Sequence, residues 1–242
     1  MSRFYVPKDS VRGREIHILG SEAHHIFDVL RLKENDPVCA FDGTGKEYLG
    51  TIKTASKRSV IIGISATEEA RQEDHAEFVL VQAVPKKDRM DNIVEKATEL
   101  GVRSIIPALT ERTVVRLEGD RLKKRHQRWV RIAEQASQQC GRVKVPAIEK
   151  PISFRGALGI VKEMDLKLIA CLEKDTKNIK DALAGFQGKG IALFIGPEGD
   201  FTGEEVSAAK AEGAVSVSLG PRVLKSDTAG IALLSILDYE IN

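Results

Sequence analysis

Three short apolar runs in the last third of the chain constrain its possible folds most. They are 166–172, 190–196 and 214–220, and we interpret them as strands that are apolar on both faces. Such strands are typical of a parallel sheet whose two faces are covered by helices. Two earlier strand patterns, at 77–84 and 102–109, alternate with helical patterns. The sequence therefore predicts a domain of the α/β class with a parallel sheet.

The first seventy residues have a different pattern of short, β-branched and partly alternating segments, which predicts a small β-barrel. A hairpin-type turn is expected at 42–45, and one helix is expected to begin near Ser21, which can cap it. The predicted strands of this part are 15–19, 36–43, 46–55 and 59–66.

A charged segment separates the two parts of the chain. Residues 66–77 lose the apolar periodicity of their neighbours, as a linker or domain boundary does. We place the boundary near Arg71, which predicts a β-barrel domain at 1–71 and an α/β domain at 72–242.

Composition excludes several classes of protein. The formal net charge is only +2, so the chain is not uniformly coated with positive charge, although local basic patches remain possible. The three cysteines form no CxxC pair, and the neighbouring His24 and His25 have no companion ligands, so we expect neither a disulfide framework nor a metal site. No apolar stretch is long enough for a membrane span, and we expect a cytoplasmic protein with no membrane association.

Two Gly-Pro turns follow neighbouring predicted strands. One lies at 196–199 and is followed by Thr202 and Glu205, which match a helix capping box; the other begins at Gly220. The carboxyl ends of parallel strands are where open α/β sheets bind ligands. Neither a dinucleotide-binding nor a phosphate-binding glycine motif is present, nor is a G-x-S-x-G hydrolase motif. Loops of this kind suit an adenosyl ligand better than a triphosphate.

The same segments resemble a known family. The stretches IGPEGDFTGEEV (195–206) and SLGPRVLKSDTAGIALLSIL (218–237) are similar to those of the SPOUT superfamily of S-adenosylmethionine-dependent RNA methyltransferases. More narrowly, the chain resembles the RsmE family, which methylates uridine N3 in 16S ribosomal RNA. Further support comes from 85–115, from QCGRVKVP (139–146) and from HHIFDVLR (24–31). The resemblance implies a PUA-like β-barrel followed by a parallel-sheet domain with a trefoil knot.

The resemblance also implies which residues bind S-adenosylmethionine. They lie in three strand-end loops and at the start of the last helix, and are Cys171, Leu172, Glu173, Ile195, Gly196, Pro197, Gly199, Leu219, Gly220, Val223, Leu224 and Thr228. The chain departs from the family pattern at Asp200, where a second glycine is commoner. It also has Lys225, Ser226 and Asp227 in place of the usual arginine, threonine and glutamate.

Two residues are candidates for catalysis. The imide N3 of uridine is a weak nucleophile until its proton leaves, so positioning and stabilising the developing negative charge are the main tasks. We assign Arg222 to charge stabilisation and Glu198 to orienting the loop or assisting proton transfer. A phosphate contact or a structural ion pair is the alternative role for Arg222.

RNA contacts are expected from positive and polar groups in both domains. A predicted helix with six Lys or Arg residues between 121 and 131 presents a basic face that is either an RNA contact or simply solvated. Gln139 and Arg142 match the Q-x-x-R pattern of the family, and His25 is a further candidate. The full set of RNA-binding candidates is Arg3, Arg12, His25, Arg31, Lys86, Lys87, Arg89, Gln139 and Arg142.

The apolar last helix predicts burial within the chain or against a partner, and the resemblance favours a homodimer formed through the knotted domains. The partners expected are therefore 16S ribosomal RNA of the small ribosomal subunit and a second copy of the chain. Two alternatives remain: an RNA-binding or ribosome-assembly factor with the same fold, and a SPOUT ribose 2′-O methyltransferase. The latter class lacks HHIFDVLR together with ELGVRSIIPALTERT, which this chain has at 24–31 and 99–113.

Overall fold

The computed structural model describes residues 1–70, 76–115 and 119–241, and these form two compact units. The first unit contains 1–70 together with 137–145, and the second contains the other described residues. The predicted boundary at Arg71 lies within 71–75, outside the described residues, and stays a prediction.

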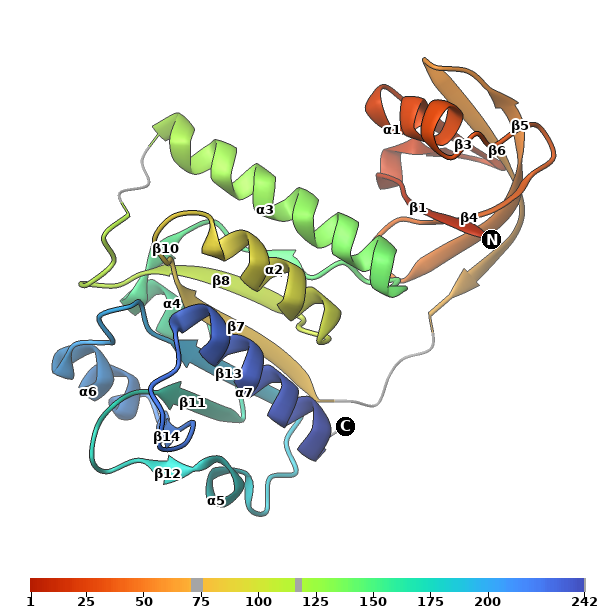
Figure 1. The fold of residues 1–242 in the computed structure, drawn as a ribbon. Coiled ribbons are helices and arrows are strands. Elements are labelled where there is room, and N and C mark those ends of the chain that lie inside the picture. The colour runs from red at the N-terminus through yellow and green to blue at the C-terminus, as the bar shows by residue number, and fades with distance from the viewer. Residues whose placement is uncertain (71–75, 116–118, 242) are drawn as a thin grey trace. The chain divides into compact units, whose positions relative to one another are not determined.

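The first unit is built on a six-stranded sheet with the order β1-β4-β5-β6-β3-β2 (Figure 1). β1 and β4 are parallel, and the other neighbours are antiparallel. Alternate strand residues point into a core with Phe4, Ile16, Val38 and Ile62 at its centre. The strands are β1 (Ser2–Tyr5), β2 (Val11–Arg12), β3 (Glu15–Leu19), β4 (Pro37–Phe41), β5 (Lys46–Ala55) and β6 (Ser59–Glu69).

The structure of the first unit agrees in part with the turn and the helix that the sequence predicts. Gly43 and Gly45, in the turn that joins β4 to β5, both have positive φ angles, as expected of a glycine-rich hairpin turn. The predicted helix begins at Ser21 and consists of α1 (Ser21–His24) continued by a π-helical turn, η2 (His25–Val29). The capping role predicted for Ser21 is wrong, because Gly20 occupies the N-cap position and no side chain caps the helix. A 3-10 turn, η1 (Lys8–Ser10), precedes β2.

Residues 137–145 belong to the first unit and are joined to it by hydrogen bonds with Arg3, Tyr5 and Gly43. The N–H of Tyr5 donates to Oε1 of Gln138 at 3.0 Å, and Nη2 of Arg3 donates to the carbonyl oxygen of Arg142 at 3.0 Å. The N–H of Val145 donates to the carbonyl oxygen of Gly43 at 3.1 Å. The α/β domain predicted at 72–242 includes this segment.

The second unit is an α/β domain whose sheet has the order β10-β8-β7-β13-β11-β14-β12, with β9 also beside β8 (Figure 1). All of its strand pairs are parallel, which confirms the predicted fold class. The strands are β7 (Glu77–Ala83), β8 (Ser104–Leu109), β9 (Ala147–Ile148), β10 (Ile152–Ser153), β11 (Leu166–Ala170), β12 (Lys177–Asn178), β13 (Gly190–Ile195) and β14 (Val215–Ser218). The helices are α2 (Arg89–Glu99), α3 (Gly119–Cys140, whose last turn lies in the first unit), α4 (Phe154–Ile160), α5 (Ile179–Leu183), α6 (Gly203–Ala211) and α7 (Ser226–Ile241).

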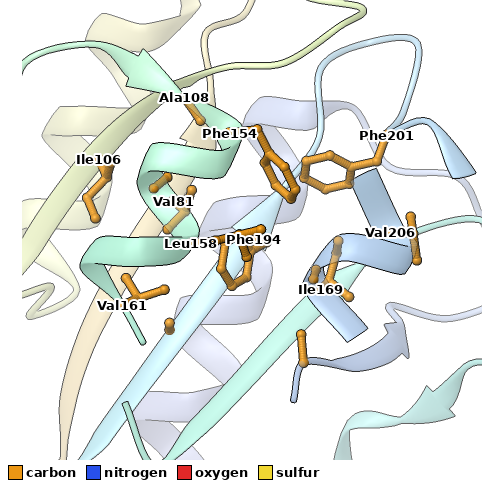
Figure 2. Packing of buried hydrophobic residues seen from close by; sticks show 14 of the residues in the cluster. Val81, Ile106, Ala108, Phe154, Leu158, Val161, Ile169, Phe194, Phe201 and Val206 are labelled. Carbon is orange, nitrogen blue, oxygen red and sulfur yellow. The ribbon is translucent and has the colours of Figure 1, made fainter. Parts of the chain in front are cut away.

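Helices cover both faces of this sheet. On one face, α4 and α6 pack on strand residues such as Val81 and Phe194, and the ring of Phe154 lies against Phe194 and Phe201 (Figure 2). On the other face, α2 and α7 pack against each other, and α7 lies over β7 and β13. Gly230 permits this close approach, because a Cβ atom there would lie 3.0 Å from Oε1 of Gln82.

Local signals define several helix ends. Thr202 and Glu205 form the predicted capping box at the start of α6, and Gly213 has a positive φ just beyond its end. Gly101 likewise has a positive φ after α2. Asp88 occupies the N-cap position of α2, but its side chain accepts no capping hydrogen bond.

The chain returns twice into the middle of the sheet. β13 lies between β7 and β11, and β14 lies between β11 and β12. Each of these two strands therefore lies between two strands that precede it in the sequence. This order brings the loops after β11, β13 and β14 to the same edge. The trefoil knot itself stays a prediction.

Candidate active site

A cavity of about 270 Å³ lies at the carboxyl ends of β11, β13 and β14. The three loops that follow these strands and the first turn of α7 form its walls. The lining residues are Ala170, Cys171, Leu172, Ile195, Gly196, Pro197, Glu198, Asp200, Val217, Ser218, Leu219, Gly220, Arg222, Val223, Leu224, Lys225, Ser226 and Ala229. A strand-end site of this kind is what the two Gly-Pro turns predict.

Most of the predicted cofactor residues lie together in this cavity. Arg222 and Glu198, the two candidates for catalysis, also line it. The predicted cofactor residues among the lining residues are Cys171, Leu172, Ile195, Gly196, Pro197, Leu219, Gly220, Val223 and Leu224.

Three predicted cofactor residues are not part of this lining. Glu173 accepts a hydrogen bond of 2.5 Å from Nζ of Lys210. The carbonyl oxygen of Gly199 accepts one of 2.6 Å from Nη1 of Arg112. Thr228 is exposed on α7.

Several lining residues were not predicted as cofactor residues. Ala170 ends β11, and Val217 and Ser218 are the last two residues of β14. The strands predicted from the sequence extend two residues further, to 172 and 220. Asp200, Lys225 and Ser226 stand out in the sequence only as departures from the family pattern. Ala229 follows them in the first turn of α7.

The loop after β13 is held by buried hydrogen bonds. Oγ of Ser226 donates to the carbonyl oxygen of Gly196 at 2.5 Å and accepts from Nε2 of Gln82 at 2.9 Å. Gly196 is required by space rather than by its φ angle, because a Cβ atom would lie 3.2 Å from the main-chain nitrogen of Phe201.

The two candidates for catalysis differ in their surroundings. Oε1 of Glu198 accepts hydrogen bonds from the N–H of Lys86 at 3.1 Å and from Nη1 of Arg89 at 3.3 Å. These contacts join the loop after β13 to the loop after β7. Arg222 is exposed to solvent and is one of the residues that line the cavity.

The RNA-binding candidates of the second unit lie close to this loop. Lys86 and Arg89 contact Glu198, and the exposed Lys87 has a positive φ and accepts a hydrogen bond from Arg125 through its carbonyl oxygen at 3.0 Å. The basic face of α3 is exposed, while Trp129 on the same helix is buried.

The RNA-binding candidates of the first unit differ in their exposure to solvent. Arg12, Arg31 and Gln139 are exposed. His25 is half-buried, with Nδ1 3.7 Å from a carboxylate oxygen of Glu22. Arg142 is half-buried.

Arg3 is already engaged by other groups of the first unit. Its guanidinium pairs with Glu47, donates to the carbonyl oxygen of Arg142 and lies 4.4 Å from the centre of the Phe41 ring. The contact with Arg142 joins the segment 137–145 to β1. An RNA contact by Arg3 would compete with them.

No group of His, Cys, Asp and Glu side chains among residues 1–70, 76–115 and 119–241 is placed to hold a metal ion. None of the helices in the described part of the chain combines the length and apolar character needed to cross a membrane.

Comparisons with known proteins agree with this architecture. The sequence profile of the RNA methyltransferase domain matches residues 72–238, and that of the RNA methyltransferase PUA domain matches 18–65. Ribosomal RNA small subunit methyltransferase E from Bacillus subtilis is 30% identical over 92% of this chain and 89% of its own length.

Solved structures are similar over nearly the whole chain. A putative methyltransferase from Legionella pneumophila, determined with bound S-adenosylmethionine, has a TM-score of 0.89 and 32% identity over 98% of this chain and 97% of its own. Ribosomal RNA small subunit methyltransferase E from Neisseria gonorrhoeae, bound to S-adenosylmethionine, has a TM-score of 0.85 and 30% identity over 99% and 98% of the two chains.

The parallel sheet with its strand-end cavity and the preceding PUA domain define a two-part RNA methyltransferase. The chain belongs to the ribosomal RNA small subunit methyltransferase E family, RsmE, as the resemblance implied.

Proposed function

We propose that this protein transfers a methyl group from S-adenosylmethionine to N3 of a uridine in 16S ribosomal RNA of the small ribosomal subunit. The observation that carries the proposal is the cavity at the ends of β11, β13 and β14, in a chain that belongs to this family. Two similar structures hold S-adenosylmethionine.

The residues present fit this cofactor. The cavity is lined by glycine-containing loops and by apolar side chains such as Leu172, Val223 and Leu224. Main-chain N–H and C=O groups in such loops can bind the edge of an adenine ring, and the apolar side chains can contact its faces. S-adenosylmethionine, when bound, supplies a methyl group that is already electrophilic because it is attached to a sulfonium.

The protein must then position the uracil and manage the N3 proton. We assign Arg222 to stabilising the negative charge that develops on the uracil as this proton leaves, and its position in the lining of the cavity supports this role. Glu198 orients the loop after β13 through its contacts with Lys86 and Arg89, so we assign it to positioning rather than to proton transfer. We also propose that the predicted cofactor residues that line the cavity bind S-adenosylmethionine.

RNA binding is proposed for positive and polar groups of both units. Lys86, Lys87 and Arg89 are close to the cavity loops, and Arg12, Arg31, His25, Gln139 and Arg142 belong to the first unit. Arg3 is proposed to act through Arg142 instead of contacting RNA directly.

A homodimer through the second unit is also part of the proposal. α7 buries Leu233, Leu234 and Leu237 within the chain, while Ile231 and Ile236 remain half-exposed and available to a second copy. The protein would act in the cytoplasm, where small ribosomal subunits are found. Light scattering at assay concentration is expected to give twice the mass of the chain, and a monomer would contradict the dimer.

The activity is tested with S-adenosylmethionine that carries a labelled methyl group. The protein is incubated with small ribosomal subunits from cells that lack this modification, and the RNA is digested and analysed by mass spectrometry. Label in 3-methyluridine is expected. Label on a ribose 2′ oxygen, or RNA binding without any transfer, would contradict the proposal and support one of the two alternatives.

A further inference from the structure

Asp200 has a backbone conformation that is unfavourable for most residues with a side chain. Its φ angle is +61°, in the left-handed region. Asp and Asn tolerate this region better than other residues, but a non-glycine residue there still needs compensating contacts. The turn is closed by a hydrogen bond of 3.0 Å from the N–H of Asp200 to the carbonyl oxygen of Pro197.

The carboxylate of Asp200 supplies two such contacts. Oδ1 accepts a hydrogen bond of 2.8 Å from the N–H of Phe201, in its own loop. Oδ2 accepts one of 2.9 Å from the N–H of Leu172, in the loop after β11. The carboxylate therefore joins the ends of two neighbouring strands, whose last paired residues are Ala170 and Ile195.

Asp200 and Leu172 both line the cavity. Leu172 itself is 65% exposed, so packing of its side chain does little to hold its loop. We propose that Asp200 is a positioning residue whose carboxylate fixes the loop after β11 against the loop after β13, and so forms two walls of the methyl-donor site before the donor arrives. This inference rests on the proposed function.

A similar bridge is found at the opposite end of the same two strands. Asp165 precedes β11, and its Oδ2 accepts hydrogen bonds of 2.8 Å each from the N–H groups of Lys189 and Gly190, at the start of β13. Asp165 is not among the residues that line the cavity. It provides a matched control, because it makes the same type of contact between the same strands away from the donor site.

The test compares Asp200→Gly and Asp200→Asn with Asp165→Asn. Glycine accepts the φ angle of position 200, so Asp200→Gly removes the bridge without adding backbone strain. Asn keeps the size of the side chain but offers one acceptor oxygen and an NH₂ group to two N–H donors. Calorimetry measures the Kd of S-adenosylmethionine and of its demethylated product, S-adenosylhomocysteine, and hydrogen exchange follows the amide of Leu172.

Both Asp200 variants are expected to raise the Kd of both ligands by about tenfold, the effect of losing a hydrogen bond to a charged group. The amide of Leu172 should exchange faster, and the KM for the donor should rise more than kcat falls. Asp165→Asn should lower the thermal midpoint while leaving both Kd values as in the wild type.

Three results would overturn the inference. Wild-type affinity in Asp200→Gly would show that the bridge is not needed. Weaker binding of the sulfonium-bearing donor alone would show that the carboxylate acts through its charge. An equal loss of affinity in Asp165→Asn would show a general effect of strand-end bridges. If the wild-type protein does not bind S-adenosylmethionine, the proposed function fails as well.

Discussion

The hydroxyl of Ser226 donates a hydrogen bond of 2.5 Å to the carbonyl oxygen of Gly196. Ser226 is the first residue of α7, and Gly196 is the first residue after β13. The hydroxyl also accepts from Nε2 of the fully buried Gln82 on β7. One serine thus connects α7, β7 and the wall of the cavity.

Replacing Ser226 with alanine is expected to lower the free energy of unfolding by about 1–3 kcal/mol, because the buried Gly196 carbonyl and Gln82 amide each lose a partner. The Kd for S-adenosylmethionine should rise, since the loop after β13 loses its support. Urea denaturation and calorimetry measure the two effects. Ser235→Ala is the matched control, because that hydroxyl is exposed on the same helix and donates only to the carbonyl oxygen of Ile231. Equal stability of the two variants would contradict the prediction.

Arg222→Ala is expected to lower kcat by about a hundredfold, the typical effect of removing one group that stabilises a developing charge. The Kd values for S-adenosylmethionine and for small ribosomal subunits should stay close to those of the wild type. Single-turnover kinetics and filter binding provide the measurements. Arg155→Ala is the control: it removes an exposed arginine that lies on α4, and it should leave kcat unchanged. If Arg222→Ala weakens RNA binding and leaves kcat intact, Arg222 is a phosphate contact.

Arg12 and Arg3 are expected to respond differently to substitution by alanine. Arg12 is exposed on β2, and its loss should reduce the salt dependence of binding to small ribosomal subunits by about one phosphate contact. Arg3 is held by Glu47 and by the carbonyl oxygen of Arg142, so its loss should first lower the thermal midpoint. Binding at several salt concentrations, together with thermal unfolding, separates the two effects. A change in salt dependence without any loss of stability in Arg3→Ala would show that Arg3 contacts RNA.

The ionisation of Tyr48 is expected to lower the stability of the protein at high pH. Burial, together with the hydrogen bond that its hydroxyl donates to Asp42, raises the pKa of Tyr48 from 10.0 to about 12. A raised pKa in the folded state gives stability that is complete below the unfolded-state pKa and is lost as the pH rises through the folded-state value. The free energy of unfolding should therefore fall between about pH 10 and about pH 12.

Tyr48→Phe isolates this effect, because it removes the titrating group and keeps the ring. Burial also raises the pKa of Cys39 to about 11, but this thiol is present in both proteins. Urea denaturation across this pH range should show a steeper loss of stability in the wild type than in the variant. Parallel curves would contradict the prediction.

The sequence predicts the features that depend on neighbouring residues or on simple patterns. The strand at 190–196, the capping box of Thr202 and Glu205, and the strand-end site beside Gly196 are of this kind. Each follows from apolar runs, turn residues or helix signals within a short window.

Features that depend on distant contacts were not predictable in this way. The left-handed conformation of Asp200 is stabilised by Leu172, 28 positions earlier. The place of residues 137–145 in the first unit depends on contacts with β1 and with Gly43, which no pattern in the segment itself reveals. The two-residue strand β2 carries too short a pattern to distinguish it from a loop.

We expect the cavity at the ends of β11, β13 and β14 to hold the methyl donor. The most direct measurement is a crystal structure of the protein with S-adenosylmethionine. We expect the cofactor to contact Leu172, Gly196 and Leu224, with its methyl group facing the side on which Arg222 lies. A cofactor bound elsewhere, or no binding at concentrations that saturate the relatives, would contradict the account.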